Sequence, residues 1–192
     1  NNLGVLAAQS GDRLQARALW EKCEEIAREI HDMHRLSGIY NNLGIDALET
    51  GSLQQAEEYY LKALTMFRRL KSPRDQVELL SNLGELSYYR ADYARAQAYW
   101  QEALHLAASV EDRESQVEPL VYLGKLLATL EDLEKAEATL STAQNLAHEL
   151  SVKKGEGQAW EGLAMLHARR GERDQSALAL QNAHAVLTPE VD

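Results

Sequence analysis

The chain has 192 residues, a net charge of −10 and an isoelectric point near 5.1. Its excess of carboxylates repels phosphate groups, which argues against nucleic acid as a partner. The single cysteine, Cys23, excludes an intrachain disulfide, and no apolar stretch is long enough to suggest a membrane span. These features favour a reducing compartment, and we expect a cytoplasmic location.

A tetrad that returns every forty residues is the most informative feature of the sequence. It occupies residues 1–4, 41–44, 81–84, 121–124 and 161–164, and it ends in Leu-Gly four times and in Leu-Ala once. Sixteen positions after each Gly or Ala stands a large apolar residue: Trp20, Tyr60, Trp100, Leu140 and Leu180. A fixed period of about 20–50 residues predicts a solenoid of stacked supersecondary units.

The unit at 33–72 indicates how each repeat is built. Apolar residues recur at three- and four-residue steps over 39–48 and again over 53–70, which predicts two amphipathic helices. Between them, Gly51 is placed to end the first helix in a left-handed conformation, and Ser52 is placed to cap the second. Each unit is therefore predicted to be a helical hairpin.

Small and large residues alternate at fixed places within each hairpin. Gly44 and Ala56 leave room for two helix backbones to approach closely. Tyr60 is expected to fill the wedge between its own hairpin and the next one. By the same rule, we expect Trp20 and Trp100 to be largely buried.

The repeat divides the chain into five units, which we expect to form one domain of ten helices without a strand: 1–32, 33–72, 73–112, 113–152 and 153–187. The sequence opens without Met and inside a helix, so we expect a fragment of a larger protein. Ser72 and Pro73 suit a helix start. Pro119 is predicted to shorten or kink the first helix of the fourth unit. The last helix is expected to end near Leu187, with Pro189 closing the ordered part.

This order of residues resembles the tetratricopeptide repeat (TPR), whose pattern runs W-x2-L-G-x2-Y and then A-x3-F. The second unit matches it as Tyr40-x2-Leu43-Gly44 and Ala56-x3-Tyr60, and the resemblance covers essentially the whole chain. The longer period makes the repeats similar to those of kinesin light chain, Leu-Gly-Asn-type polarity adaptors and bacterial signal-transducing ATPases. The resemblance implies an all-α fold, a right-handed superhelical solenoid of about five TPR hairpins.

Patterns typical of catalysis or cofactor binding are weak. His31 and His34 could hold a metal, but without a fixed ligand pattern we interpret them as solvated linker residues. The segment 155–157, Gly-Glu-Gly, lacks the rest of a phosphate-binding loop, so we interpret it as a flexible start of a helix. We therefore expect no enzyme activity, no cofactor and no metal.

The first helix of each unit is expected to line the concave wall of the superhelix, where ligands bind. The candidate groove residues are Asn42, Asn82, Glu49, Glu78, Glu85, Tyr88, Tyr89, Glu118, Tyr122, Lys125 and Arg169. The resemblance implies that Asn42 and Asn82 pair with the backbone of an extended peptide. Alternatively, they bond a neighbouring helix and stiffen the stack. The carboxylates favour a basic or amphipathic segment.

Two functions remain open. The leading hypothesis is a scaffold, adaptor or sensor that binds a protein or peptide, with no membrane or nucleic acid as partner. The alternative is a self-associating or intramolecular regulatory arm of a larger signalling ATPase or transcriptional regulator. An uncovered apolar face on the first hairpin also predicts weak homo-oligomers through an end of the stack.

Overall fold

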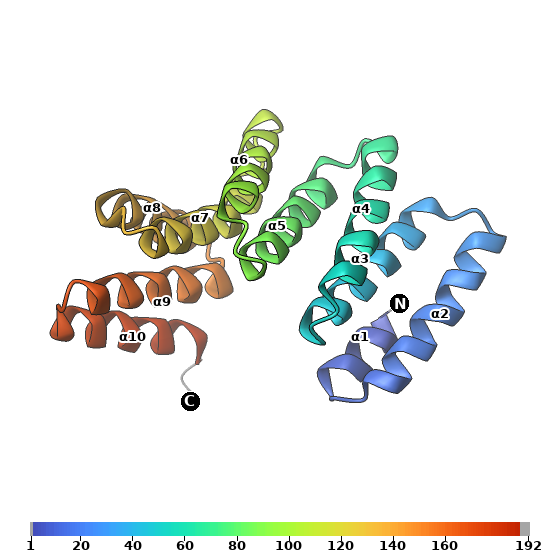
Figure 1. Cartoon of the computed structure of the whole chain (residues 1–192), viewed down its shortest axis with the longest axis horizontal. Helices are drawn as coiled ribbons and strands as arrows, with labels where there is room; N and C mark the ends of the chain where they lie inside the picture. The colour runs from blue at the N-terminus through green and yellow to red at the C-terminus, as the bar shows by residue number, and fades with distance from the viewer. Residues whose placement is uncertain (1, 189–192) are drawn as a thin grey trace. The chain divides into compact units, whose positions relative to one another are not determined.

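The computed structural model describes residues 2–188 (Figure 1). Over these residues the chain forms ten α-helices and one 3-10 helix, with no strand, which confirms the all-α prediction. The helices pack pairwise as TPR hairpins, about five in number. None of the helices in this range is both long and apolar enough to cross a membrane.

The chain falls into two compact units. Unit 1 runs through Asp92 and holds α1 (Asn2–Gln9), α2 (Arg13–Glu29), α3 (Met33–Glu49), α4 (Leu53–Leu70) and α5 (Pro73–Tyr89). Unit 2 begins at Tyr93 and holds α6 (Tyr93–Ser109), η1 (Glu114–Gln116), α7 (Val117–Thr129), α8 (Leu133–Glu149), α9 (Lys153–Arg169) and α10 (Arg173–Leu187). The boundary lies inside the predicted repeat 73–112. A single continuous array therefore stays a prediction.

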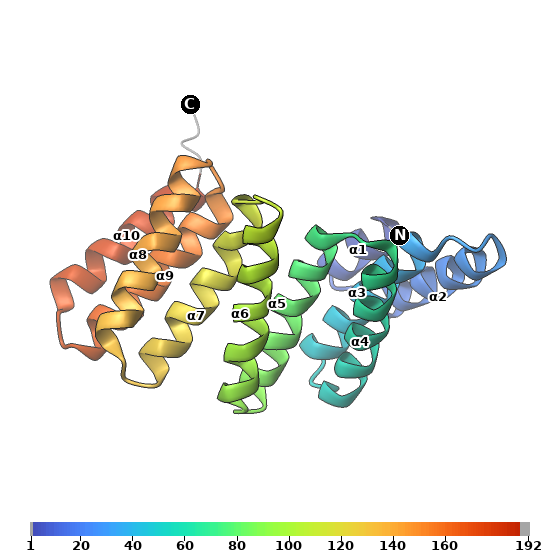
Figure 2. The same ribbon diagram turned by 90° about the horizontal axis from the view of Figure 1, so that it is seen from above.

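Within each unit, consecutive helices pack against one another (Figure 2). In unit 1, α3 packs against α2 and α4 and also contacts α5; in unit 2, α9 packs against α8 and α10 and also contacts α7. The first helices of neighbouring hairpins thus lie side by side in each unit. This arrangement brings the candidate residues of α3 and α5 onto one surface.

The alternation of small and large residues does create the close packing that the sequence predicts. Trp20, Tyr60 and Trp100 are 3%, 0% and 1% exposed, as expected. A methyl group added to Gly44 would lie only 2.5 Å from the Tyr60 ring, far inside normal contact distance. The ring therefore packs against the first helix of its own hairpin, and the expectation that it also fills the wedge toward the next hairpin stays a prediction. Leu140, at the position equivalent to Tyr60, contacts both hairpins. It lies against Gly124 of its own hairpin and clusters with residues of α9 in the next one.

The nine turns between helices of the described residues share one backbone geometry. Each holds one residue with positive φ, and these residues are twenty positions apart: Gly11, His31, Gly51, Lys71, Ala91, Glu111, Glu131, Ser151 and Gly171. The next backbone N–H donates to a carbonyl five residues earlier, as from Asp32 to Ala27, which is the Schellman motif. The predicted role of Gly51 is confirmed, with φ at +76°. Ser52 is the N-cap residue of α4, but its side chain makes no capping hydrogen bond.

The fourth unit starts irregularly, as Pro119 predicts. Its first helix, α7, begins at Val117 and has 13 residues, whereas α3, α5 and α9 have 17 each. Pro119 thereby falls in the first turn of the helix, where its missing N–H has no intrahelical partner to lose. The 3-10 helix η1 fills the gap, and Asp112 accepts a hydrogen bond from the backbone N–H of Ser115 at 3.1 Å.

The Gly-Glu-Gly segment at 155–157 is not a flexible helix start, and that interpretation is wrong. It forms the buried first turn of α9. A methyl group on Gly155 would lie 2.4 Å from Val117, and one on Gly157 would lie 2.7 Å from Leu187. The two glycines are therefore positions of close helix packing. The predicted end of the last helix at Leu187 is confirmed, while Pro189 lies outside the described residues.

Candidate functional site

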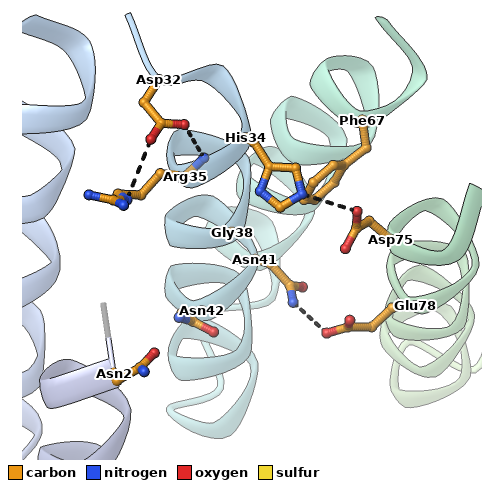
Figure 3. A pocket seen from close by; sticks show the side chains of 10 residues that line it. All are labelled: Asn2, Asp32, His34, Arg35, Gly38, Asn41, Asn42, Phe67, Asp75 and Glu78. Atoms are coloured by element: carbon orange, nitrogen blue, oxygen red, sulfur yellow. Dashed lines mark hydrogen bonds and ion pairs between the residues drawn. The ribbon is translucent and has the colours of Figure 1, made fainter. Parts of the chain in front are cut away.

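A polar hollow of about 390 Å³ opens in unit 1, along α3 (Figure 3). Ten residues from α1, α3, α4, α5 and their turns line it: Asn2, Asp32, His34, Arg35, Gly38, Asn41, Asn42, Phe67, Asp75 and Glu78. Two of the predicted groove residues, Asn42 and Glu78, are among them. Three carboxylates and one guanidinium face this space, so its lining is acidic when His34 is neutral.

A chain of carboxamide hydrogen bonds joins α3 to α5 beside the hollow. Asn82 donates from Nδ2 to Oδ1 of Asn41 at 2.9 Å, and Asn41 donates from Nδ2 to Oε1 of Glu78 at 2.7 Å. In Figure 3 Asn41 and Glu78 point toward one another across the gap between their helices. One donor of Asn82 is therefore used inside the protein, as the structural alternative expects, although its second donor and its oxygen leave the ligand-binding alternative open.

His34 and Phe67 form the opposite end of the hollow. The His34 ring meets the edge of Phe67 with ring centres 5.5 Å apart, and its Nε2 lies 3.5 Å from Oδ2 of Asp75. Asp32 accepts from the backbone N–H of Arg35 at 2.9 Å and lies 3.5 Å from its guanidinium. Over residues 2–188 no three His, Cys, Asp or Glu side chains gather as a metal site would require.

A second hollow lies further along α3, on the other side of Asn42. It is lined by the apolar residues Val5, Ala8, Trp20 and Ile45 and by the polar residues Gln9, Asn42, Asp46 and Glu49, and the surface exposed in it is mainly apolar. Asn42 lines both hollows, so they are neighbours along α3. A segment that follows α3 would pass from a polar, acidic space to a more apolar one.

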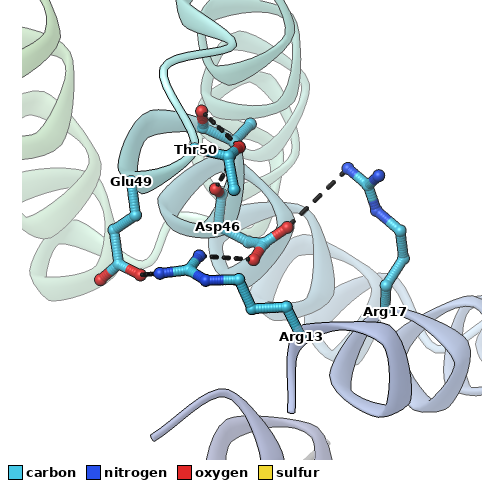
Figure 4. A network of polar contacts seen from close by, with 6 residues as sticks. Arg13, Arg17, Asp46, Glu49 and Thr50 are labelled. Carbon is cyan, nitrogen blue, oxygen red and sulfur yellow. Dashed lines mark hydrogen bonds and ion pairs between the residues drawn. The ribbon is translucent and has the colours of Figure 1, made fainter. Parts of the chain in front are cut away.

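Arginines of α2 compensate the acidic side chains of this second hollow (Figure 4). Arg13 lies 3.0 Å from the buried carboxylate of Asp46 and 2.9 Å from that of Glu49. Arg17 approaches the other oxygen of Asp46 at 3.8 Å. Glu49, predicted to make the groove acidic, is therefore paired, and the acidic character is concentrated at the first hollow.

The remaining candidate residues of unit 1 lie along α5. The hydroxyl of Tyr89 lies 3.4 Å from Oε1 of Glu85, and the rings of Tyr88 and Tyr89 meet edge to face with centres 6.3 Å apart. The Glu85 charge, together with partial burial, raises the pKa of Tyr89 above its usual value. Burial, with smaller effects of Glu85, Glu49 and Glu78, likewise raises the pKa of the Tyr60 phenol. Tyr89 is 61% exposed and offers a flat apolar surface to solvent.

The candidate residues of unit 2 form a separate group. Tyr122 stacks on Trp100 with ring centres 5.2 Å apart and planes 7° apart, so one face of its ring is already covered. The Lys125 ammonium lies 3.7 Å from Glu161. Glu118 is half-buried in the first turn of α7, and Arg169 is exposed at the end of α9.

The hollow of unit 1 also contains residues that the sequence did not single out as ligand contacts. Asn41, Phe67 and Asp75 belong to it, and His34 was considered only as a metal ligand. The sequence signal that could have pointed to Asn41 is that Asn41 and Asn42 form a pair, whereas the equivalent positions of the next unit hold Ser81 and Asn82.

Comparisons with known proteins agree with this architecture. Residues 1–69 match the family model described as tetratricopeptide repeat. The fold resembles BtubC (BKLC) from P. vanneervenii, with a TM-score of 0.77, 19% identity, and coverage of 99% of this chain and 81% of that one. It also resembles aspartyl phosphate phosphatase F from Bacillus subtilis, with a TM-score of 0.81 and 14% identity; 95% of this chain aligns with 48% of that protein, about half its length.

A third similar structure is a Podosopora anserina protein described as kinesin light chain nearly identical TPR-like repeats. Its TM-score is 0.63 at 14% identity, and the match covers 97% of this chain and 92% of that one. At these identities the likeness shows the fold alone. A search of curated proteins gave no match. The family match therefore assigns tetratricopeptide repeats to residues 1–69, and the helical hairpins over the described residues have the fold of such repeats.

Proposed function

We propose that unit 1 is a protein-binding module that takes a basic or amphipathic segment along α3. The observation that carries this proposal is the pair of neighbouring hollows that share Asn42 in their linings. One is acidic and the other is largely apolar. A segment with a cationic side chain and an apolar side chain, spaced to reach both, would match this surface.

The acidic hollow supplies the charge preference. Asp32, Asp75 and Glu78 line it against the single guanidinium of Arg35, which is paired with Asp32. Glu78 is exposed and accepts one hydrogen bond, from Asn41, so its carboxylate retains acceptor capacity toward a ligand cation. A Lys or Arg side chain beside Asp75 and Glu78 would be attracted, whereas an acidic one would be repelled.

The apolar hollow supplies the second half of the preference. Val5, Ala8, Trp20 and Ile45 contribute aliphatic and aromatic surface. The carboxylates of Asp46 and Glu49 at its edge are held by Arg13, so they compete little for a ligand cation. An apolar ligand side chain placed here would bury surface at little electrostatic cost.

A charge-reversal experiment tests the proposal. Peptides selected on the full chain from a random library are titrated by calorimetry against the native protein and two variants. Glu78→Lys should weaken binding of a basic peptide at least tenfold. Glu58→Lys, the same change on an exposed residue of α4 that lines neither hollow, is the matched control and should change affinity little. Selection of acidic peptides, or equal effects of both variants, would contradict the proposed charge preference.

The role of Asn82 separates the two alternatives for the asparagines. If Asn82 contacts the ligand backbone, Asn82→Ala should weaken binding by roughly 1–3 kcal/mol and leave stability nearly unchanged. If its bond to Asn41 is its whole role, the variant should instead lower the unfolding temperature and leave affinity intact. Calorimetry and thermal unfolding of the same sample decide between them.

We extend the proposal to an adaptor or sensor role without catalysis, in the cytoplasm. The single, half-buried Cys23 supports a reducing compartment. Tyr122, Lys125, Glu118 and Arg169 are proposed as a second contact surface on unit 2. The alternative, a regulatory or self-associating arm of a larger switch, predicts no selectable peptide and contacts with the chain itself or a second copy.

A further inference from the structure

A third hollow, of about 640 Å³, lies between α3 and α4, and the surface exposed in it is mainly apolar. From α3 it is lined by Met33, Leu36 and Tyr40, which share one face of the helix. Asn42 and Ile45, which line the hollows already described, lie on the opposite face of α3 at 3.6 residues per turn. This third hollow is therefore separate from the surface to which the proposed function refers.

The apolar residues of this hollow are specific to the second repeat. Leu61 of α4 lines it and is 40% exposed. In steps of forty, the positions equivalent to Leu61 hold Glu21, Gln101, Ser141 and Gln181, and those equivalent to Leu36 hold Gln76, Gln116 and Glu156. Both walls of the hollow also have neighbours within the chain, since α3 packs against α2 and α4 packs against α5. The apolar surface is thus a feature of one internal repeat.

The charges around this hollow differ in sign from the chain as a whole. Lys62 and Arg69 line it together with a single carboxylate, that of Glu58, although the chain has a net charge of −10. The Lys62 ammonium lies 5.9 Å from the centre of the Tyr40 ring and 5.6 Å from that of Tyr59, so the two rings hold it beside the hollow. At the position of Arg69, three other repeats hold Glu29, Ser109 and Glu149. The second repeat therefore combines an exposed apolar surface with local positive charge.

We propose that this hollow binds an acidic amphipathic helix of a partner protein. From Glu58 to Arg69 the hollow follows α4 for about 17 Å, which corresponds to about three turns of a partner helix. A helix satisfies its own backbone hydrogen bonds, whereas an extended segment would find no strand edge in residues 2–188 with which to pair. The shape and length of the hollow therefore suit a helix better than a strand.

The apolar and charged side chains define which face of the partner helix binds. Its apolar stripe lies against Leu61, Met33 and Met66, and the flexible methionine side chains adapt to its shape. Carboxylates at the edge of the stripe meet Lys62 and Arg69, which are seven residues, or about two turns, apart on α4. A basic helix would be repelled by the same two cations.

Selection of helical peptides tests the proposal. A library on a helical scaffold, with the positions of one face randomised, is selected on the full native chain. The selected peptides should carry carboxylates seven residues apart beside an apolar stripe. In titration calorimetry, Leu61→Gln and Arg69→Glu should each weaken their binding about tenfold or more. Other repeats hold these residue types at the equivalent positions, Gln101 and Glu149, so the circular dichroism of both variants should match that of the native chain.

Leu70→Gln is the matched control, because Leu70 is also a 40% exposed residue of α4 and does not line the hollow. This variant should bind the selected peptides like the native chain, and Glu78→Lys, a change in the first hollow, should not weaken their binding. An acidic peptide whose affinity falls with Leu61→Gln is assigned to the third hollow and does not bear on the charge preference of the other two.

A charge exchange identifies the ion pair itself. A peptide in which Lys replaces the carboxylate that faces Arg69 should bind the Arg69→Glu variant more tightly than the native chain. The proposal is overturned by a selection that yields no acidic helix, or by acidic helices whose affinity is the same for the native chain, Leu61→Gln and Arg69→Glu. Equal losses with Leu70→Gln and Leu61→Gln, or no gain in the charge exchange, overturn it as well.

Discussion

The substitution Gly44→Ala has two opposite effects on the stability of the protein, and the structure indicates which effect is larger. In the interior of a helix, Ala is favoured over Gly by about 1 kcal/mol, so propensity alone predicts a more stable protein. The added carbon, however, would lie 2.5 Å from both Cδ1 and Cε1 of Tyr60, about 1 Å inside normal carbon–carbon contact. Tyr60 is fully buried, so its ring has no free space to enter.

Overpacking of this kind costs about 1–3 kcal/mol. Set against the helix propensity, this leaves a net loss of up to about 2 kcal/mol in the free energy of unfolding. Urea unfolding followed by circular dichroism measures it. In a Tyr60→Ala background the clash disappears, and the same Gly44→Ala change should become neutral or stabilising. A stabilising effect of Gly44→Ala in the native background would refute the packing argument.

Three further outcomes follow from other contacts. In urea unfolding, Asp46→Leu should leave the free energy of unfolding unchanged or raise it by up to about 1 kcal/mol. A buried ion pair contributes little net stability, and the next unit holds Leu86 at the equivalent position. A loss above about 2 kcal/mol would contradict this expectation. Glu85→Gln removes the main cause of the raised pKa of Tyr89, so by NMR titration the phenol should ionise at lower pH; an unchanged titration would exclude that cause. Ala91→Gly should raise the midpoint of urea unfolding, by about 1 kcal/mol in stability, because φ at Ala91 is +58°, a region that strains side chains with a Cβ; a lower midpoint would show that this strain is small.

The local structure was predictable because it depends on single residues and short spacings. The forty-residue period predicted the ten helices, Gly51 predicted a left-handed turn, and Pro119 predicted the short α7. Each of these effects acts within one helix or turn, where backbone sterics and side-chain size are sufficient. Gly44 was expected to let two helix backbones approach closely, and its specific contact with the Tyr60 ring was not predicted.

The hydrogen bonding of the candidate site was not predictable in the same way. For Asn82 the sequence left open a ligand contact or a bond to a neighbouring helix, and it did not indicate that Asn41 would be the partner of one of its donors. Glu49 was expected to add charge to the groove, yet it is paired with Arg13, which lies 36 residues earlier. Such partners are set by the distance and rotation between packed helices, and the spacing within one helix carries no information about either.

The nine identical turns have a consequence for how this chain can change in length. The backbone geometry returns every twenty residues, so a deletion that runs from one turn to any other would rejoin two turns of the same shape. A deletion of twenty, however, would place α2 next to α4, and these two helices both carry the large aromatic residue, Trp20 and Tyr60, with no glycine to receive it. A deletion of forty restores the match between glycine and ring. Side-chain size, not the backbone, therefore sets the step by which such a protein can gain or lose material during evolution.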